Sequence, residues 1–169
     1  AVDLWTSAEE NLNRFKQTNT DQNIIPFQAD AYNLPFENEY FDAVISVDSY
    51  HYFGNNDEYF NKYLKKYLKK DAIIALAFPG MKFEIKDNIP EEMKPFWDKD
   101  ILEMCHSIEW WKPKFENFIK NIEIKELECF DEAWESWLKT DNPYAISDRD
   151  MIKTDNNKYM NLIGLIGIN

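Results

Sequence analysis

The stretch QADAYNLPFENEYFDAVISV, residues 28–47, decides the fold class of this 169-residue chain. Its last seven residues, FDAVISV, are mostly apolar and β-branched, which predicts a strand buried on both faces. A similar run at residues 72–78 predicts a second buried strand, and the apolar spacing in between predicts a helix over residues 57–70. Strands separated by helices pair in parallel through right-handed crossovers, so this region indicates an α/β protein.

The rest of the chain continues this alternation of strands and helices. The expected elements are strands at residues 1–5, 24–29, 122–130 and 159–168, helices at residues 7–17, 91–98, 108–119 and 131–139, and a polar linker at residues 141–157. The two closing strands are expected to form an antiparallel pair at one edge. We therefore predict one domain over residues 1–169, an α/β three-layer sandwich with a mostly parallel sheet and a helical lid at residues 81–118.

Charge and composition count against several classes of protein. Asp and Glu outnumber Lys and Arg by 31 to 19, a formal charge of −12, whereas nucleic acids are bound by clustered cations. No apolar run comes near the roughly 20 residues that cross a bilayer, so no membrane partner is expected. The two cysteines, Cys105 and Cys129, are too few for a disulfide framework, and we expect reduced core residues in a cytoplasmic protein. Cys105 and His106 alone do not make a metal site.

Acidic residues follow the first three predicted strands. They are Asp3, Asp30 and Asp48. In open parallel sheets, ligands bind at the carboxyl ends of the strands, and an acid there can accept hydrogen bonds from both hydroxyls of a ribose. Acids also follow strands simply because they cap turns, so the spacing leaves both interpretations open.

The central stretch resembles a known family. Residues 30–44 match the pattern D-A-x-x-L-P-F-x-x-x-x-F-D-x-V of class I S-adenosylmethionine-dependent methyltransferases, the type found in ubiquinone and menaquinone biosynthesis. Residues 48–53 and 106–111 resemble a bacterial small-molecule branch of that family. The resemblance implies a Rossmann-like sheet, S-adenosyl-L-methionine as cofactor, and a small molecule as methyl acceptor.

The resemblance also implies roles for individual residues at the predicted strand ends. Asp3 would contact the ribose of the cofactor. Leu4, Asp30 and the backbone amide of Ala31 would contact the adenine. Val47 and Asp48 would lie on the methionine side. These residues would hold the cofactor by hydrogen bonds to its sugar and base and by apolar contact with its ring.

Four further residues are expected near the acceptor. His51 would orient the acceptor or take a proton from it, since histidine changes charge near neutral pH, but a packed histidine is the alternative. Tyr50, Trp110 and Trp111 would line the acceptor pocket. Tryptophans in this segment are also explained by core or lid packing, and an aromatic cage for a quaternary ammonium is a third interpretation.

The chain departs from the family pattern at its start. A strand followed by a glycine-rich loop should precede Ala1, yet the first glycine is Gly54. Glycine lets the backbone pass close to the cofactor, so we expect an N-terminally truncated form with weak or no cofactor binding by these residues alone. Without that central strand, two sheet edges would be bare, and either re-pairing or a second chain, as in a homo-oligomer, would complete the sheet.

Two alternatives to a methyltransferase stay open at this stage. One is a non-catalytic, methyltransferase-like fragment or interaction module. The other is a different nucleotide-binding α/β enzyme such as a dehydrogenase, although Leu34-Pro35-Phe36 and the motif at residues 41–44 have no role in binding a nicotinamide.

Overall fold

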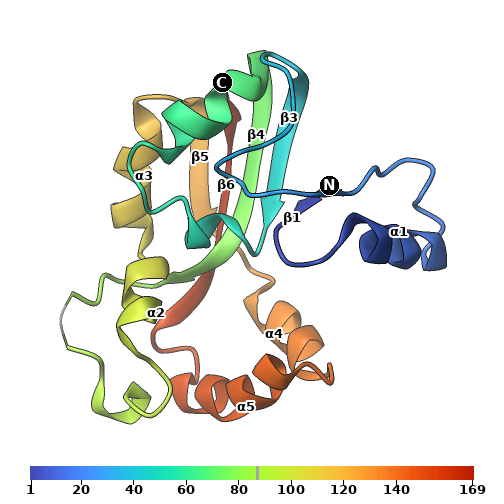
Figure 1. The fold of residues 1–169 in the computed structure, drawn as a ribbon. Helices are drawn as coiled ribbons and strands as arrows, with labels where there is room; N and C mark the ends of the chain where they lie inside the picture. The colour runs from blue at the N-terminus through green and yellow to red at the C-terminus, as the bar shows by residue number, and fades with distance from the viewer. Residues whose placement is uncertain (87) are drawn as a thin grey trace.

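A computed structural model describes residues 1–86 and 88–169, and its strands form two sheets (Figure 1). The small sheet pairs β1 (Val2–Asp3) in parallel with β2 (Phe27–Gln28). The large sheet has the order β3-β4-β6-β5, formed by β3 (Phe41–Val47), β4 (Leu68–Met81), β6 (Met160–Ile168) and β5 (Lys120–Glu126). β3 and β4 are parallel, and β6 is antiparallel to both of its neighbours. The structure confirms the mixed α/β class and the antiparallel closing pair.

The helices after β3 gather on one side and at one end of the large sheet, whereas the first helix lies on the other side, beyond β1 and β3 (Figure 1). The helices are α1 (Ala8–Gln17), α2 (Lys99–Met104), α3 (Ile108–Glu116), α4 (Phe130–Leu138) and α5 (Pro143–Asp155), with short helical turns at Tyr50–Tyr52, Phe60–Leu64, Lys65–Tyr67 and Glu91–Met93. In Figure 1, α3 lies beside β5, while α4 and α5 lie beyond the lower end of the sheet. In the described part of the chain, no helix combines the length and the apolar character that a membrane crossing requires.

The predicted helix over residues 57–70 is wrong in its second half. The segment forms short helical turns from Phe60 to Tyr67, and β4 already begins at Leu68, which is buried and pairs with Phe41. The ladder then shifts register, and Asp71 adopts a left-handed backbone with φ 62°. Pairing with β3 therefore overrides the helical spacing of this lysine-rich segment.

The predicted linker at residues 141–157 is also wrong, because it is helix α5. The Asn142 side chain caps the helix by accepting the Tyr144 amide at 2.9 Å, and Pro143 occupies the first turn. Both are strong signals for a helix start. Ala145 and Met151 are buried, so a narrow apolar stripe anchors an otherwise polar helix.

Residues 81–118 contain less helix than predicted. Only the turn Glu91–Met93 forms in the first expected helix, α2 follows at Lys99–Met104, and α3 continues through Pro113 to Glu116. Residue 87 of the predicted lid lies outside the described residues.

The core lies on one face of the large sheet only. Phe78, Ile74 and Ile163 point into it and are fully buried beneath α3 and the Phe60–Tyr67 turns. On the opposite face, Ile45 and Val47 of β3 are 73% and 69% exposed, so the prediction of a strand buried on both faces is wrong. Ile73 of β4 and Ile166 of β6 share this face and are also exposed. We call Ile45, Val47, Ile73 and Ile166 the open sheet face.

The two cysteines have different surroundings. Both are free, and Cys105 is buried as expected, whereas Cys129 is exposed at the start of α4. The prediction that both are core residues is therefore wrong for Cys129.

Candidate functional site

The first two acids lie side by side at the carboxyl end of the small sheet. Asp3 pairs with Gln28 across the parallel ladder, and its carbonyl oxygen accepts the Ala29 amide at 3.0 Å. Asp30 is the next residue along. Asp3 and Asp30 thus follow neighbouring parallel strands at the same edge, as expected for residues that share one ligand.

Asp3 is an anion held by the turn into α1. Its Oδ1 accepts the backbone amides of Trp5 and Thr6, each at 2.8 Å. Desolvation acts to raise the pKa of Asp3, but these hydrogen bonds and one from Asn11 outweigh it, and the pKa is lowered. The carboxylate is therefore ionised at neutral pH and positioned by the backbone rather than by a basic side chain.

Asp30 and Ala31 form the matching turn after β2. Asp30 is exposed, and its Oδ1 accepts the Tyr32 amide at 2.9 Å. The Ala31 carbonyl accepts the Tyr59 hydroxyl at 3.1 Å, which ties this turn to the buried aromatic core. One carboxylate oxygen of each acid is engaged in its own turn, and Leu4 beside Asp3 exposes an apolar side chain.

The end of β3 carries the third acid. Val47 is exposed, and Asp48 turns the chain with a left-handed backbone of φ 53°, a conformation that aspartate tolerates better than most residues. The Asp48 amide still donates to the Ala77 carbonyl at 2.8 Å. Partial burial raises the pKa of the Asp48 carboxyl, so this acid is held in a less polar setting than Asp3.

His51 is buried next to this turn. Burial lowers the pKa of its imidazole to about 4, so the ring is neutral at pH 7. Its Nδ1 has no hydrogen-bond partner among the described residues, and its ring lies 4.1 Å from that of Tyr52. A neutral ring with a free nitrogen can accept or donate one hydrogen bond, depending on its tautomer.

The structure buries two of the three predicted acceptor residues and packs the third against a histidine. Tyr50 and Trp111 pack against Phe78 in the core and have almost no exposed surface to offer a ligand. Trp110 stacks on His106 at 3.5 Å between ring centroids, with the Lys114 ammonium 3.9 Å from the centre of its ring. These positions agree with the alternative interpretation of the tryptophans as packing residues.

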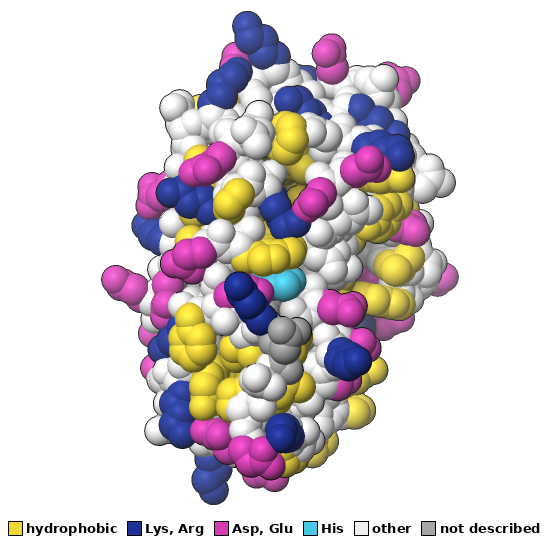
Figure 2. All heavy atoms as spheres, turned by 90° about the vertical axis from the view of Figure 1, so that its left-hand side faces the viewer, with side chains coloured by type: hydrophobic (Ala, Val, Ile, Leu, Met, Phe, Trp, Pro, Cys, Tyr) yellow, Lys and Arg dark blue, Asp and Glu magenta, His cyan; other side chains and the backbone are white. Residues whose placement is uncertain are grey.

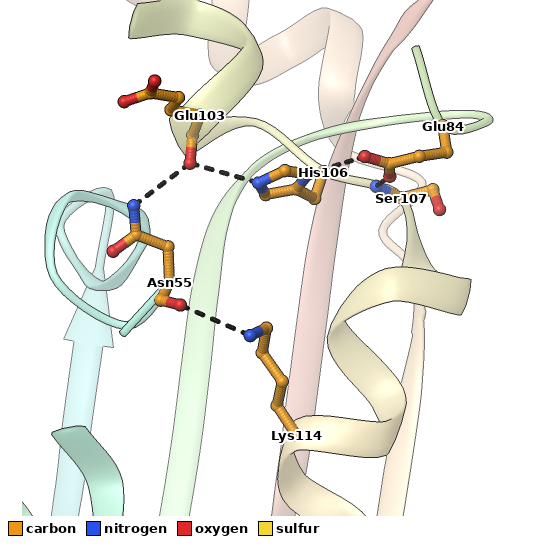
Figure 3. A network of polar contacts seen from close by, with 6 residues as sticks. All are labelled: Asn55, Glu84, Glu103, His106, Ser107 and Lys114. Carbon is orange, nitrogen blue, oxygen red and sulfur yellow. Dashed lines mark hydrogen bonds and ion pairs between the residues drawn. The ribbon is translucent and has the colours of Figure 1, made fainter. Parts of the chain in front are cut away.

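A polar network holds the segment around His106 (Figure 3). Its Nδ1 lies 2.7 Å from a Glu84 carboxylate oxygen and its Nε2 lies 3.1 Å from the Glu103 carbonyl oxygen. The other Glu84 oxygen accepts the Ser107 amide at 3.0 Å. The network joins the segment after β4 to the α2–α3 junction, so His106 has a structural role. No cluster of three or more metal-ligating side chains occurs among the described residues.

The side of the molecule that carries α2 and α3 shows mixed charge. Figure 2 shows basic and acidic side chains interspersed there, with apolar side chains and one histidine between them. This face therefore presents no continuous basic surface.

Sequence reasoning missed two aromatic residues at the strand ends. Trp5 and Tyr52 are exposed, and their ring centroids lie 6.0 Å apart with the ring planes at 85°. The available signal was position alone: Trp5 lies two residues after Asp3 and Tyr52 lies four residues after Asp48. The carboxyl edge therefore presents acids and open aromatic rings together.

Comparison with known proteins agrees with this geometry. Residues 1–76, which hold β1 to β3 and all three acids, match the methyltransferase domain family. This part of the chain is therefore similar to methyltransferases. No curated protein sequence matches the chain.

Solved structures of low sequence identity share the fold of this chain. One, from Galdieria sulphuraria and described as a sarcosine dimethylglycine methyltransferase, has 13% identity and a TM-score of 0.70, with 99% of this chain and 68% of that chain covered. A geranyl diphosphate methyltransferase in complex with S-adenosylmethionine has 14% identity and a TM-score of 0.68, with 99% and 66% covered.

A third is the geranyl diphosphate C-methyltransferase of Streptomyces coelicolor A3(2), crystallised with Mg²⁺, geranyl diphosphate and S-adenosyl-L-homocysteine. It has 14% identity and a TM-score of 0.69, with 99% and 60% covered. The chain thus spans 60–68% of the length of these three proteins.

Proposed function

We propose that this chain transfers a methyl group from S-adenosylmethionine to a small-molecule acceptor, with the cofactor bound across the carboxyl ends of β1, β2 and β3. The observation that carries the proposal is the position of Asp3 and Asp30 at the carboxyl ends of the paired parallel strands β1 and β2, inside the segment that matches the methyltransferase family. Two acids at one edge suit a nucleoside, which offers hydroxyl and amino donors a few ångströms apart.

The residues at this edge fit the chemistry of the cofactor. Asp3 is ionised and so is suited to accept hydrogen bonds from the ribose hydroxyls, while Asp30 and the Ala31 amide would face the adenine. Leu4 and Val47 are exposed apolar side chains at this edge and would pack against apolar parts of the cofactor. Asp48 would lie on the methionine side.

When bound, S-adenosylmethionine supplies an electrophilic methyl group that the lone pair of an acceptor displaces from sulfur. The contribution of the chain is to hold the acceptor in line and to exclude water, which removes much of the entropic barrier. His51 is neutral at pH 7 and its unpaired Nδ1 is buried, which favours the alternative of a packed histidine over direct contact with the acceptor. Its low pKa makes it a weak base.

The site also needs more polypeptide than the two sheets provide. β1 and β3 both run toward the candidate site, yet they belong to different sheets. Val2 of β1 and Ile45 and Val47 of β3 expose their apolar side chains. We propose that a further strand and glycine-rich loop pair between β1 and β3, as the family resemblance implies. Supporting this proposal, the solved methyltransferases above are longer than this chain.

A second candidate function is an interaction module without activity of its own. The open sheet face favours it, because four exposed apolar side chains on one sheet surface are typical of an interface. A second copy of the chain would cover this face in a homo-oligomer. The two functions differ in whether the strand ends bind the cofactor.

Calorimetric titration with S-adenosylmethionine separates them. The titration uses the 169-residue chain and a version extended upstream along its reading frame. Methyltransferase function predicts micromolar binding by at least one of the two, and binding by neither contradicts the proposal.

A matched set of variants tests the strand-end acids. Asp3→Asn keeps an oxygen for the Trp5 and Thr6 amides but removes the charge, and we expect affinity to fall about 10-fold, as for a charge-assisted hydrogen bond. Asp30→Asn should act similarly. Asp42→Asn is the control, since Asp42 is an exposed acid of the same motif that pairs with Lys69 away from the strand ends.

A further inference from the structure

Trp5 and Tyr52 form an open aromatic corner beside the proposed cofactor site. Trp5 follows the end of β1 and Tyr52 follows the end of β3, and their rings stand nearly perpendicular with centroids 6.0 Å apart. The two residues are 75% and 50% exposed, so neither ring is packed as a core residue. The pair is edge-to-face, and the exposed surface of each ring remains available to a ligand.

The surroundings of the corner are acidic. Burial of part of the Tyr52 phenol raises its pKa, and the charges of Asp48 and Asp148 raise it further. Among the described residues, none of the groups that shift this pKa is a cation. The local field therefore favours a positive charge on a ligand.

Asp148 is held in place on α5. One of its carboxylate oxygens accepts the Trp137 indole N–H at 2.9 Å, which orients the side chain between α4 and α5. Aromatic faces together with nearby carboxylates are the usual means of binding an alkylammonium group, because the ring quadrupole and the charges attract it in the same direction.

We infer that the corner of Trp5 and Tyr52, with Asp48 beside it, binds a cationic amine, and that the nitrogen of this amine is the methyl acceptor. The assignment of the amine as acceptor rests on the proposed function, whereas the binding of the cation rests on the corner alone. The proposal places the acceptor between the end of β3 and α5.

The chemistry of transfer to an amine balances without a further reagent. The ammonium first loses one proton to water, which leaves a lone pair on nitrogen. That pair forms the N–C bond while the S–C bond breaks and its electrons stay on sulfur. The methylated product is an ammonium ion and carries a positive charge. The corner therefore also binds the product, and product inhibition is expected.

The test uses choline and its neutral isostere 3,3-dimethylbutan-1-ol, in which carbon replaces the charged nitrogen. Isothermal titration of the full chain should show choline binding at least about 10-fold more tightly than the alcohol. Tyr52→Leu and Trp5→Leu should each weaken choline binding about 2- to 10-fold. Tyr52→Phe keeps the ring face and should stay within about twofold of the unmodified chain.

Tyr40→Leu is the matched control, since Tyr40 is an exposed tyrosine at the opposite end of β3 and should leave choline affinity unchanged. Equal binding of choline and the alcohol overturns the proposal. So does a Tyr52→Phe variant that loses as much affinity as Tyr52→Leu, because the ring face would then have no part. Competition between adenosine and choline would assign the corner to the cofactor base and also overturn it.

A parallel titration with S-adenosylmethionine distinguishes failure of this inference from failure of the proposed function. Suppose that choline binds more tightly than the alcohol but that neither the chain nor its extended version binds S-adenosylmethionine. This result refutes the methyltransferase proposal and leaves the cation site standing. Cofactor binding without choline discrimination refutes the cation site alone. The Tyr52→Leu variant should keep its cofactor affinity within about twofold if the ring serves the acceptor.

Discussion

Two neighbouring isoleucines of β4 test the one-sided core of this protein. Ile74 is completely buried on the core face, whereas Ile73 is 50% exposed on the open sheet face. Replacing Ile74 by Ala removes buried methyl groups and leaves a cavity, which destabilises proteins by about 2–5 kcal/mol. Replacing Ile73 by Ala loses about half of a transfer free energy of roughly 2 kcal/mol and leaves no cavity, so about 1 kcal/mol is expected.

Urea unfolding followed by circular dichroism measures both changes in the free energy of unfolding. The chemistry, the strand and the sequence neighbourhood are matched, so the difference between the variants reports burial alone. A difference of at least about 1–2 kcal/mol is expected. Equal destabilisation by both variants would refute the reasoning, because it would mean that the open sheet face is covered in solution. In the upstream-extended version, the effect of Ile73→Ala should rise toward that of Ile74→Ala if the added chain packs on this face.

Three further outcomes are expected. Burial lowers the pKa of His51 from 6.5 to about 4. Between these pH values the His51 imidazole is protonated in the unfolded chain but not in the folded one, so the free energy of unfolding falls as the pH drops from 6.5 to 4. This contribution reaches about 3 kcal/mol, and His51→Gln should lack it when urea unfolding is compared at pH 7 and pH 4.5. Asp155→Ala should destabilise by about 2–3 kcal/mol in the same assay, because the buried Asp155 Oδ1 accepts two backbone amides that would lose their partner. A thiol reagent such as Ellman's should label Cys129 quickly and Cys105 only on unfolding, since burial raises the pKa of the Cys105 thiol to about 12; labelling of both at once would contradict the buried position.

Local chemistry was the reliable part of the sequence prediction. The helix expected at residues 7–17 forms as α1, and Ser7 caps it by accepting the Glu10 amide at 3.1 Å. The strands expected at residues 41–47 and 159–168 form as β3 and β6. Each of these three elements is predicted by a signal within a few residues of the sequence, either a capping side chain or a dense apolar run.

Segments whose structure depends on distant partners were predicted less well. The lysine-rich residues 65–70 have helical spacing, but hydrogen bonds to β3 make a strand from Leu68 onward. Residues 143–155 look like a polar linker, yet they form a helix because Ala145 is buried and Met151 joins a buried cluster with Met160 and Phe130. In both cases tertiary contacts outweigh a weak local preference.

The candidate site divides in the same way. The sequence by itself determined the acids after three strands and the family motif, because these depend on the order of residues along the chain. Only the tertiary structure decided that Tyr50 and Trp111 lie in the core while Trp5 and Tyr52 stand open at the carboxyl edge. An aromatic side chain carries no local sign of its burial, since burial depends on which elements pack over it, and here helices cover one face of the large sheet and leave the other open.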